Sequence, residues 1–311
     1  MTMKNRHDFI LLMDVKNGNP NGDPDLNGQP RQCPITSKGL ITDVCIKRKI
    51  RNSILTRHLG EASRNILIQE GVILNDLISA PYETDEEVKK AFEALKNKEK
   101  GADPVALAKI ALQKDYYDVR AFGAVMSTGD SEEGEGSKED SKETKKKKYK
   151  KNAGVVRGPV QVTWAESFHP IFIGTETITR SCVTNKEDEN KERTMGTKYR
   201  VPYALYKCHV YISASDAAKT GFSDEDLALL KESIINMFED DRSSSRGEMI
   251  LRKFVDFKHE SKYGNAPAHK LFERLKVELN NGVDVPTSYQ DYTVTLDESN
   301  FPSGVSVENI V

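Results

Sequence analysis

The sequence predicts an α+β fold in which helices cover an antiparallel sheet. The prediction rests on the order of its hydrophobic patterns. Strand-like runs lie at 7–16, 155–168, 171–183, 199–213 and 249–257, and helical patterns lie at 39–58 and 223–238. Strand side chains alternate with period two, whereas helical ones recur every three to four residues. The runs 171–183 and 199–213 are the two arms of one long hairpin. When one arm is counted with the insertions and the insertions are left out, the order is strand, helix, strand, strand, helix, strand. This is the ferredoxin-like order that RNA-recognition modules share.

The overall composition limits how the chain can bind a polyanion. Its 311 residues contain 46 Lys and Arg against 48 Asp and Glu, for a formal net charge of -2. Hydrophobic residues make up 37% and charged residues 30%, which is typical of a soluble protein. Because no molecule-wide basic field exists, any role with nucleic acid must come from a local patch of positive charge.

Several classes of protein are excluded by missing motifs. The apolar run Phe9–Met13 is too short for a signal peptide or a membrane span, so we expect a cytoplasmic protein with no membrane partner. The cysteines, Cys33, Cys45, Cys182 and Cys208, form no C-x-x-C pair. No P-loop, dinucleotide fingerprint or H-E-x-x-H motif is present. We therefore expect no metal and no cofactor.

The first half of the chain reads as a buried strand, a turn-rich loop and a helix. The strand covers 7–16, and the Gly- and Pro-rich segment 17–38 cannot form a helix or a central strand. A helix is predicted over 39–58, and two amphipathic helical patterns follow between 86 and 112. Segment 127–152 is acidic and then lysine-rich, so we expect a flexible loop.

The second half is richer in strands. A strand over 155–168 is entered through Arg157-Gly158-Pro159, and two β-rich arms flank the polar stretch 184–198, as in a long hairpin with a mobile tip. Ser223 is expected to cap a helix that runs to Phe238. A strand at 249–257, a short helix at 269–279 and a β-rich tail complete the chain.

Positive charge is concentrated just after the turn-rich loop. Between Leu26 and His58 the only acid is Asp43, while the basic residues are Arg31, Lys38, Lys47, Arg48, Lys49, Arg51 and Arg57. On a helix, Lys47, Arg48 and Arg51 share an arc of about 100°, next to an isoleucine stripe. A helix anchored in the core and presenting fixed cations suits phosphate binding. The alternative is a solvated helix face.

Two carboxylates in the loop leave a second function open. Asp23 and Asp25 flank Pro24, and such a pair can hold Mg²⁺ together with substrate phosphates. They can equally accept hydrogen bonds from backbone amides of the turn. A metal-dependent ribonuclease using Asp23, Asp25 or Asp43 is therefore the alternative to a non-catalytic binding protein. A third possibility is a protein-interaction module whose basic helix binds an acidic partner.

Several ordered blocks resemble a known family. They are Asn19-Pro20-Asn21-Gly22-Asp23-Pro24-Asp25, the segments 39–52, 118–123 and 156–161, Arg193-Thr194-Met195-Gly196 and 201–206. Together they resemble the backbone subunit of type I-C CRISPR Cascade complexes, a Csd/Csh-type family of the RAMP superfamily. The acidic and lysine-rich insertion at 127–152 is the main departure from its pattern.

The resemblance implies a single hand-like domain. It divides the chain into a palm (about 1–58, 115–178 and 204–260) with an RNA-recognition-type sheet, a helical finger or web (about 60–114), a thumb hairpin (about 178–203) and a C-terminal extension (261–311). It also implies an RNA-binding set, namely Asn19, Asn21, Arg31, Thr42, Lys47, Arg48, Arg51, Arg120, Arg157, Gly158, Arg180, Arg193, Met195, Lys198 and Arg200. Gly158 would let the chain approach a phosphate closely, and Met195 would act as an apolar wedge that unstacks a base, unless it only covers the hairpin.

The family also implies partners. Copies would associate head to tail along one CRISPR RNA and present it for pairing with target DNA, without catalysis. Other Cascade subunits, one that binds or processes the 5′ handle and one large subunit, would complete the assembly. A filament that accepts any guide should contact phosphates and ribose rather than base edges.

Overall fold

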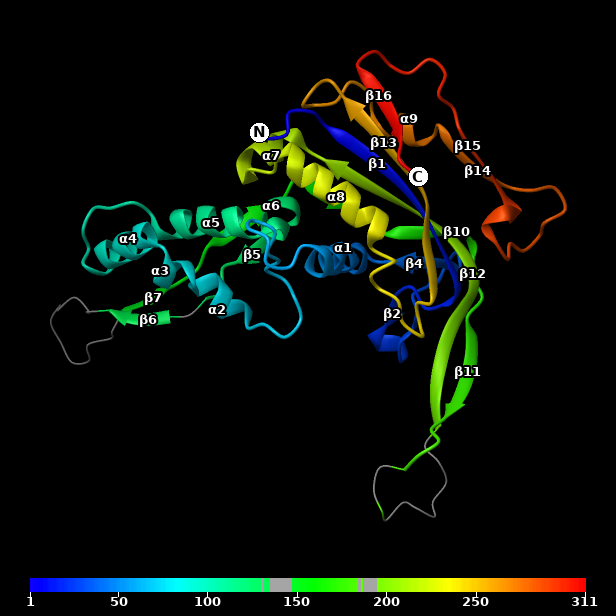
Figure 1. Ribbon diagram of the computed structural model, residues 1–311, viewed down its shortest axis with the longest axis horizontal. Coiled ribbons are helices and arrows are strands. Elements are labelled where there is room, and N and C mark those ends of the chain that lie inside the picture. The colour runs from blue at the N-terminus through cyan, green and yellow to red at the C-terminus, as the bar shows by residue number, and fades with distance from the viewer. Residues whose placement is uncertain (130, 135–146, 184–185, 187–194) are drawn as a thin grey trace. The chain divides into compact units, whose positions relative to one another are not determined.

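The computed structural model describes residues 1–129, 131–134, 147–183, 186 and 195–311 (Figure 1). The chain forms two compact units. Unit 1 contains Met1–Asn5, Ser53–Gln161 and Ile212–Ser233, and unit 2 contains Arg6–Asn52, Val162–Tyr211 and Ile234–Val311. Within the described residues no helix is long and apolar enough to cross a bilayer. Arg193 lies outside the described residues.

The described residues form a mixed α/β structure. The α-helices are α1 (Asp43–Arg57), α2 (Leu74–Ser79), α3 (Pro81–Thr84), α4 (Glu86–Lys96), α5 (Pro104–Asp115), α6 (Tyr117–Phe122), α7 (Ala214–Thr220), α8 (Asp224–Asn236) and α9 (Ala268–Phe272), with 3₁₀ turns η1 (Pro24–Leu26) and η3 (Tyr289–Asp291). The strands up to the insertion are β1 (His7–Gly18), β2 (Gly22–Asp23), β3 (Gln29–Pro30), β4 (Lys38–Ile41), β5 (Gly123–Met126), β6 (Ser131–Gly134) and β7 (Lys147–Lys150). The later strands are β8 (Gly154–Arg157), β9 (Val160–Val162), β10 (Ala165–Pro170), β11 (Gly174–Thr179), β12 (Met195–Ile212), β13 (Glu248–His259), β14 (Leu275–Leu279), β15 (Tyr292–Leu296) and β16 (Val305–Asn309).

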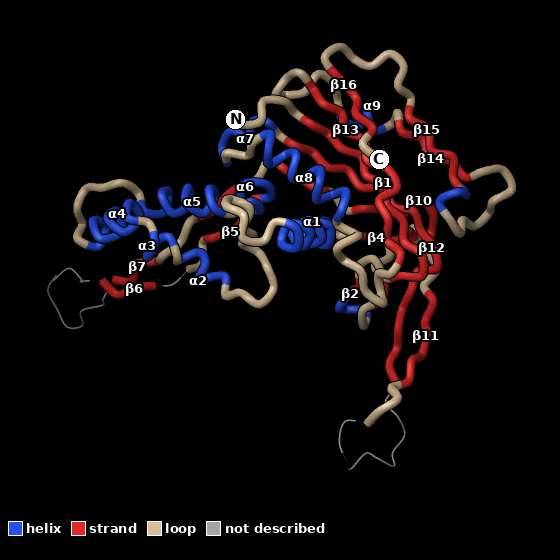
Figure 2. Tube along the Cα trace, viewed as in Figure 1, coloured by secondary structure: helices blue, strands red, loops and turns tan. Residues whose placement is uncertain are grey.

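A large sheet organises unit 2. Its main path runs β16-β13-β1-β12-β10-β4, and β11 also pairs with β12 (Figure 2). The central β1 is antiparallel to β13, from His7 opposite Lys258 to Lys16 opposite Glu248, with a register shift after Leu12. The helix α1 follows β1, and α8 lies between β12 and β13 in the sequence. The fold class is therefore mixed α/β with a large antiparallel sheet, as the hydrophobic patterns indicate.

Both faces of this sheet are covered. Ile10 and Leu12 on β1 pack with Phe272 on α9, Leu275 on β14 and Tyr292 on β15 in one apolar cluster. Alternate residues of β1 point to the opposite face, where Phe9, Leu11 and Met13 are fully buried. RNA-recognition modules bind RNA on an open sheet face. Here the C-terminal elements occupy the part of the face around β1, so any RNA must bind elsewhere.

The first helix starts later than the sequence predicts. Residues 38–41 form β4, which pairs with β10 through Ala165 opposite Ile41, and α1 begins at Asp43. A Cβ on Gly39 would lie 2.3 Å from the Tyr206 hydroxyl, so this edge of the sheet requires glycine. Helical periodicity could not show this, because sheet pairing depends on residues far along the chain.

Two helices predicted in the second half of the chain can be compared with the structure. The predicted helix 269–279 is only the short α9, and 275–279 instead form β14, antiparallel to β15. The predicted cap of α8 is confirmed: the Asp226 amide donates to the Ser223 Oγ at 3.1 Å, and the Ser223 amide donates to the Asp226 carboxylate at 3.0 Å. Its predicted apolar face, including Leu227 and Ile234, is buried.

Unit 1 has its own core. Ile78, Phe92, Leu112 and Val119 from α2, α4, α5 and α6 pack with Tyr149 at the edge of the insertion. Only the ends of segment 127–152 are described, and they form the hairpin β6–β7 rather than a structureless loop. Tyr149 on β7 is buried in the unit 1 core, which attaches this strand to the rest of the unit.

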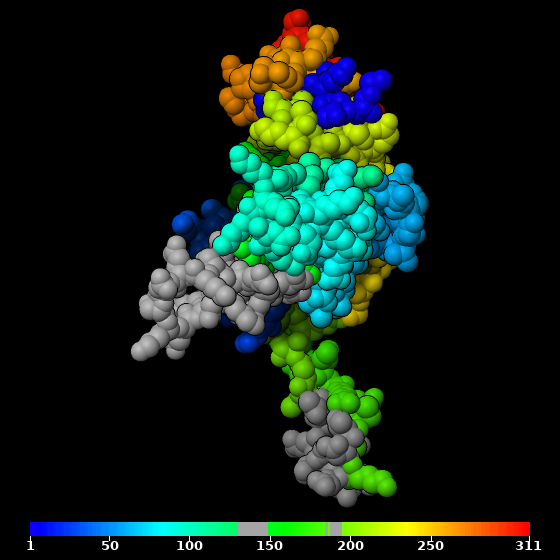
Figure 3. All heavy atoms as spheres, turned by 90° about the vertical axis from the view of Figure 1, so that its left-hand side faces the viewer, coloured from blue at the N-terminus to red at the C-terminus, as the bar shows by residue number. Residues whose placement is uncertain are grey.

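The thumb prediction falls on the hairpin of β11 and β12. Its register runs from Gly174 opposite Arg200 to Thr179 opposite Met195. Met195 and Lys198 therefore lie on a strand and not in the hairpin tip, where the polar stretch 184–198 had placed them. In Figure 3 the described part of this hairpin (green) forms a narrow projection, and Figure 2 shows that its strands continue from the large sheet of unit 2.

Candidate nucleic-acid interface

The loop between β1 and α1 is held by its asparagines. The Asn21 Oδ1 accepts hydrogen bonds from the Thr42 amide and hydroxyl, both at 3.0 Å, and the Thr42 Oγ1 accepts from the Cys45 amide at 3.2 Å. Thr42 thus caps α1 and is buried. Both side chains position the start of the helix, and their polar groups are occupied in the free protein.

Asn19 and Arg31 lie in the same loop and leave polar atoms unsatisfied. The Asn19 Nδ2 donates to the Gly28 carbonyl at 2.8 Å, and an Arg31 Nη1 donates to the Asp23 carboxylate at 3.2 Å. The Asn19 Oδ1 and the Arg31 Nε are buried without a hydrogen-bond partner. Arg31 is therefore a cation aimed by one carboxylate, with donor capacity to spare.

The basic helix exposes less charge than the sequence predicts. Lys49 and Arg51 are buried, and Lys47 and Arg48 are half-buried. The Lys47 Nζ pairs with Asp43 at 3.0 Å, and Lys49 pairs with Asp241. An exposed cationic face made by Lys47, Arg48 and Arg51 is therefore not what the fold presents. Periodicity locates the core stripe of a helix but not the other segments that fold against its flanks.

The base of the thumb contacts the loop. Arg200 donates to the Glu176 carboxylate at 2.9 Å and to the Asn17 side chain, and the Lys198 Nζ donates to the Ser244 carbonyl at 3.0 Å. Further along the hairpin, Arg180 is exposed, and the Met195 side chain is 65% exposed. An apolar side chain this exposed on a strand of the hairpin can contact a partner.

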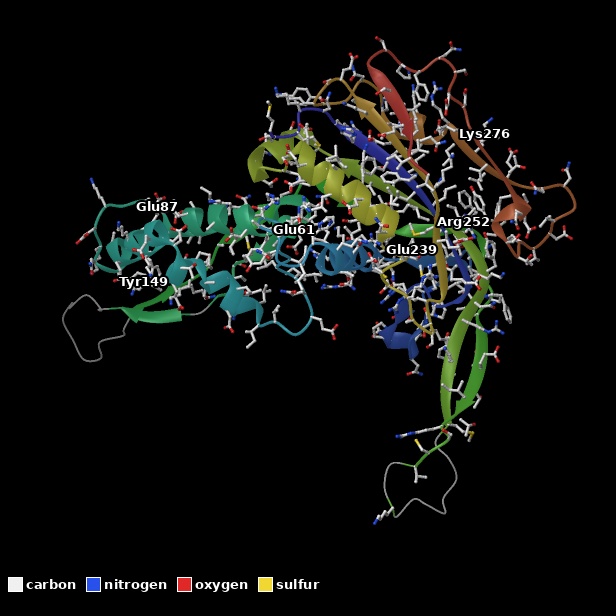
Figure 4. The ribbon with its side chains drawn as sticks, in the orientation of Figure 1. Glu61, Glu87, Tyr149, Glu239, Arg252 and Lys276 are labelled. Atoms are coloured by element: carbon white, nitrogen blue, oxygen red, sulfur yellow. The ribbon has the colours of Figure 1, made fainter. Side chains whose placement is uncertain are left out.

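Residues 239–247, which the sequence did not mark as part of a site, contact both the loop and the first helix. Residues 239–247 follow α8, starting at Glu239, which is labelled in Figure 4. The Ser245 carbonyl accepts from the Asn19 amide at 2.7 Å, and Arg246 donates to Asp241, the partner of Lys49, at 2.8 Å. Two arginines in a short serine-rich run, Arg242-Ser243-Ser244-Ser245-Arg246, were the available signal.

The combined surface in unit 2 is rich in cations that are balanced by carboxylates. We call it the loop–thumb surface, and its cations are Arg31, Lys198, Arg200, Arg242 and Arg246. Arg200 pairs with Glu176, Arg242 with Glu239 and Arg246 with Asp241. Each carboxylate fixes the direction of a cation. A phosphate oxygen can then replace or share the carboxylate at little cost in side-chain ordering.

Three members of the proposed set belong to unit 1. Arg120 is buried and forms a two-point ion pair with Asp226, at 2.8 and 3.1 Å, besides donating to three backbone carbonyls. Arg120 thus serves the structure of unit 1. Arg157 in contrast is 80% exposed, with Asp216 at 3.8 Å, so its guanidinium is accessible.

Gly158 is needed for packing within the protein. A Cβ there would lie 2.3 Å from the Ala121 carbonyl oxygen and 2.4 Å from the Gly123 nitrogen. Gly123 itself has φ +77°. The two glycines therefore let the β5 and β8 backbones approach, so packing within the protein already requires glycine at 158, whatever its contact with a phosphate.

Two of the three candidate carboxylates, those of Asp23 and Asp43, have partners within the protein. The Asp23 Oδ1 accepts from the Asp25 amide at 3.1 Å while its other oxygen binds Arg31, and Asp43 pairs with Lys47. Among the described residues, no group of three or more His, Cys, Asp or Glu side chains is placed to hold a metal ion. The turn-stabilising role that the sequence left open for Asp23 is the one the geometry shows.

Oriented Arg and Lys side chains that gather beside a long hairpin are groups that can neutralise phosphates. The model of the family described as CRISPR-associated protein Cas7 matches residues 5–297. The chain therefore belongs to the Cas7 family. A Cas7 protein of Haloferax volcanii is 41% identical over 54 residues, which is 17% of this chain and 16% of that protein.

Solved structures with a similar shape come from CRISPR complexes. A chain of a "CRISPR RNA-guided surveillance complex, pre-nicking" aligns with a TM-score of 0.47 and 14% identity, covering 81% of this chain and 75% of its own. A second chain, from a "CRISPR RNA-guided surveillance complex", gives a TM-score of 0.44 and 11% identity over 81% and 68% of the two chains. A chain of a type III-B Cmr-beta complex bound to target RNA gives 0.39 and 12% identity over 80% and 60%.

Proposed function

We propose that this chain is the non-catalytic backbone subunit of a type I-C CRISPR surveillance complex. Copies bind head to tail along a CRISPR RNA in the cytoplasm and present it for pairing with target DNA. A 5′-handle-binding or processing subunit and a large subunit complete the assembly. Membership of the Cas7 family and the ordered sequence blocks support this proposal. The strand order β13-β1-β12-β10, with α1 and α8 as crossovers, supports a ferredoxin-like palm.

One observation carries the proposal: the loop, the thumb base and segment 239–247 meet in unit 2. Asn17 and Asn19 of the loop contact Arg200 and Ser245, so cations from three distant segments lie on one surface. Their donors are amines and guanidinium groups, which can neutralise phosphates, and phosphate contacts carry no sequence information. The covered sheet face removes the usual base-stacking platform of RNA-recognition modules. Both features favour a guide held without regard to its sequence.

The test uses purified protein and two unrelated single-stranded RNAs of equal length. We expect equal affinities and a linear fall of log K with log salt concentration. Replacing Lys198 and Arg200 by Ala should weaken both complexes alike and reduce the salt slope by about 0.7 for each phosphate that the variant no longer neutralises. Lys258→Ala with Lys276→Ala, on the exposed sides of β13 and β14, is the matched control and should leave the slope unchanged.

Two results would overturn the proposal. One is failure to bind either RNA at low ionic strength, and the other is a strong preference for one sequence. The RNA should also be recovered intact after incubation with Mg²⁺. Cleavage of the RNA that a chelator prevents and that Asp25→Ala abolishes would show that the protein is a metal-dependent ribonuclease and not a non-catalytic subunit.

A further inference from the structure

Unit 2 contains an apolar pocket whose lining includes none of the cations of the loop–thumb surface. Its volume is about 490 Å³, and its lining includes Pro170, Phe172, Pro202, Tyr203, Val285 and Pro286. These residues come from the end of β10, the middle of β12 and the segment before η3. Lys16 at the end of β1 also lines the pocket. Its chemistry is that of a site for an apolar side chain.

The rim of this pocket is unusually apolar for a solvent-facing surface. The Phe172 side chain is 73% exposed and Val285 is 76% exposed. Large exposed apolar residues that gather at a concave site are typical of protein-binding surfaces. A nucleic acid fits poorly, because Lys16 is the one Lys or Arg among the lining residues and most of the others are apolar. The contact of Lys16 with the Glu248 carboxylate is long, at 3.9 Å, and exposed, so the ammonium can still bind a second carboxylate. The occupant we expect is thus a protein side chain next to an acid.

The same chain carries a segment with that chemistry. Leu26 is 54% exposed in the turn Pro24–Leu26 and follows Asp25 directly. The turn is fixed by the Asp25 amide bonding Asp23 at 3.1 Å and by the Gly28 amide bonding the Asp23 carbonyl at 2.7 Å. A fixed turn loses little entropy when its leucine is buried by a partner.

Other exposed apolar side chains match less well. Val44 also follows an acid, but Asp43 is paired with Lys47. Ile35, at 90% exposure, has Pro34 and Thr36 as neighbours and no adjacent carboxylate. Within the residues that the structure describes, Asp25 forms no ion pair, so its charge is available to a partner's lysine.

We propose that Leu26 of one copy inserts into this pocket of the next copy, with the Asp25 carboxylate beside Lys16. The inference rests on the proposed function, which requires head-to-tail contacts between copies. A head-to-tail interface joins two different surfaces of the same chain, as a pocket and a turn are, and it propagates rather than closing on itself when the rotation allows. The contact extends the proposal by naming the side chains that join neighbouring subunits.

The test separates RNA binding from assembly by using a short RNA that holds one copy and a long RNA that holds several. Wild-type protein should bind the long RNA cooperatively. Phe172→Asp and Leu26→Asp should each weaken long-RNA assembly at least about tenfold, as expected for anchor residues of an interface, and leave short-RNA binding unchanged. Ile35→Asp, an exposed apolar residue that does not line the pocket, is the control and should assemble normally.

A charge exchange tests the pairing itself. Lys16→Asp and Asp25→Lys should each reduce cooperativity, and the double variant should restore it, whereas Lys258→Asp on β13 should have no effect. Normal assembly of Phe172→Asp and Leu26→Asp, or no recovery in the double variant, would overturn the inference. If wild-type protein binds neither RNA, the proposed function fails instead. Thermal unfolding of each variant is the control for folding, and we expect substitutions at these exposed positions to leave the unfolding temperature unchanged.

Discussion

At the scale of single residues, the loop–thumb surface is defined by cations that already have partners. Arg200 illustrates the arrangement, since Glu176 binds its Nε and one Nη at 3.2 and 2.9 Å and Asn17 binds the other. Both charges are about half-exposed, so the pair stabilises the fold little. The ion pair holds the Arg200 guanidinium in one direction, but the Glu176 carboxylate also competes with a phosphate for it.

This arrangement predicts that removing the competing charge strengthens RNA binding. In Glu176→Gln the amide oxygen still accepts a hydrogen bond from Arg200 but no longer repels phosphate. We expect the Kd for single-stranded RNA to fall roughly two- to fivefold, the range set by exposed ion pairs. Fluorescence anisotropy measures this. Glu278→Gln on β14 is the control, and an unchanged or higher Kd in Glu176→Gln would remove Arg200 from the interface.

For Arg120 we expect the opposite, namely a loss of stability with no change in RNA affinity. Because it is buried against Asp226, Arg120→Ala leaves a buried carboxylate without its partner and should lower the free energy of unfolding by about 3–5 kcal/mol. Urea denaturation measures the loss. RNA affinity of the folded fraction should be unchanged, and a variant of normal stability but weak RNA binding would return Arg120 to the interface.

At the scale of elements, the C-terminal helix α9 packs on the large sheet through an aromatic contact. The His209 ring on β12 stacks on Phe272 with centroids 4.1 Å apart and planes 9° from parallel. Burial, helped by the nearby charge of Lys207, lowers the pKa of His209 to about 4. The imidazole is therefore neutral in the folded protein under ordinary conditions.

That contact gives the stability a pH dependence with a definite sign. The unfolded chain protonates His209 near pH 6.5 and the folded chain only near pH 4, so the unfolded state binds more protons between these values. The free energy of unfolding should fall as the pH drops through this window. His209→Phe keeps the stacking and should show a flatter dependence in urea denaturation at several pH values. Parallel curves for the two proteins would contradict the burial of a neutral His209.

At the scale of the whole molecule, the C-terminal elements decide which surface of the sheet is available. Ile10, Leu12, Val255 and Phe257 are covered by α9, β14 and β15. Burial of each such side chain contributes about 1.5–3 kcal/mol. The covering segment is thus part of the fold and not an accessory.

Removal of residues 261–311 should therefore unfold the protein rather than expose an RNA-binding face. We expect the shortened chain to aggregate or to bind a hydrophobic dye strongly, as measured by its soluble fraction and dye fluorescence. The control is Glu308→Gln, an exposed position on the edge strand β16 of the same segment, which should remain soluble. A soluble, folded, shortened protein with higher RNA affinity would show that the extension shields an RNA site.

Local patterns were enough to predict several of the longer elements. The continuous apolar run of β1, the Ser223 cap of α8 and the alternation in β13 each depend on neighbouring residues, and each was predicted. The predictions that were wrong depend on distant partners. Residues 38–41 are extended because β10 pairs with them, and 275–279 are extended because β15 does.

The sequence alone determined that positive charge gathers around the loop and the first helix, and its ordered blocks pointed to the family. It could not decide which of those cations reach solvent, because Lys49, for example, is buried and pairs with Asp241, far away along the chain. Only the tertiary structure brought Asn17, Arg200 and Ser244 together and covered the sheet face around β1. Periodicity reports which face of an element is buried, whereas a binding surface depends on which elements meet.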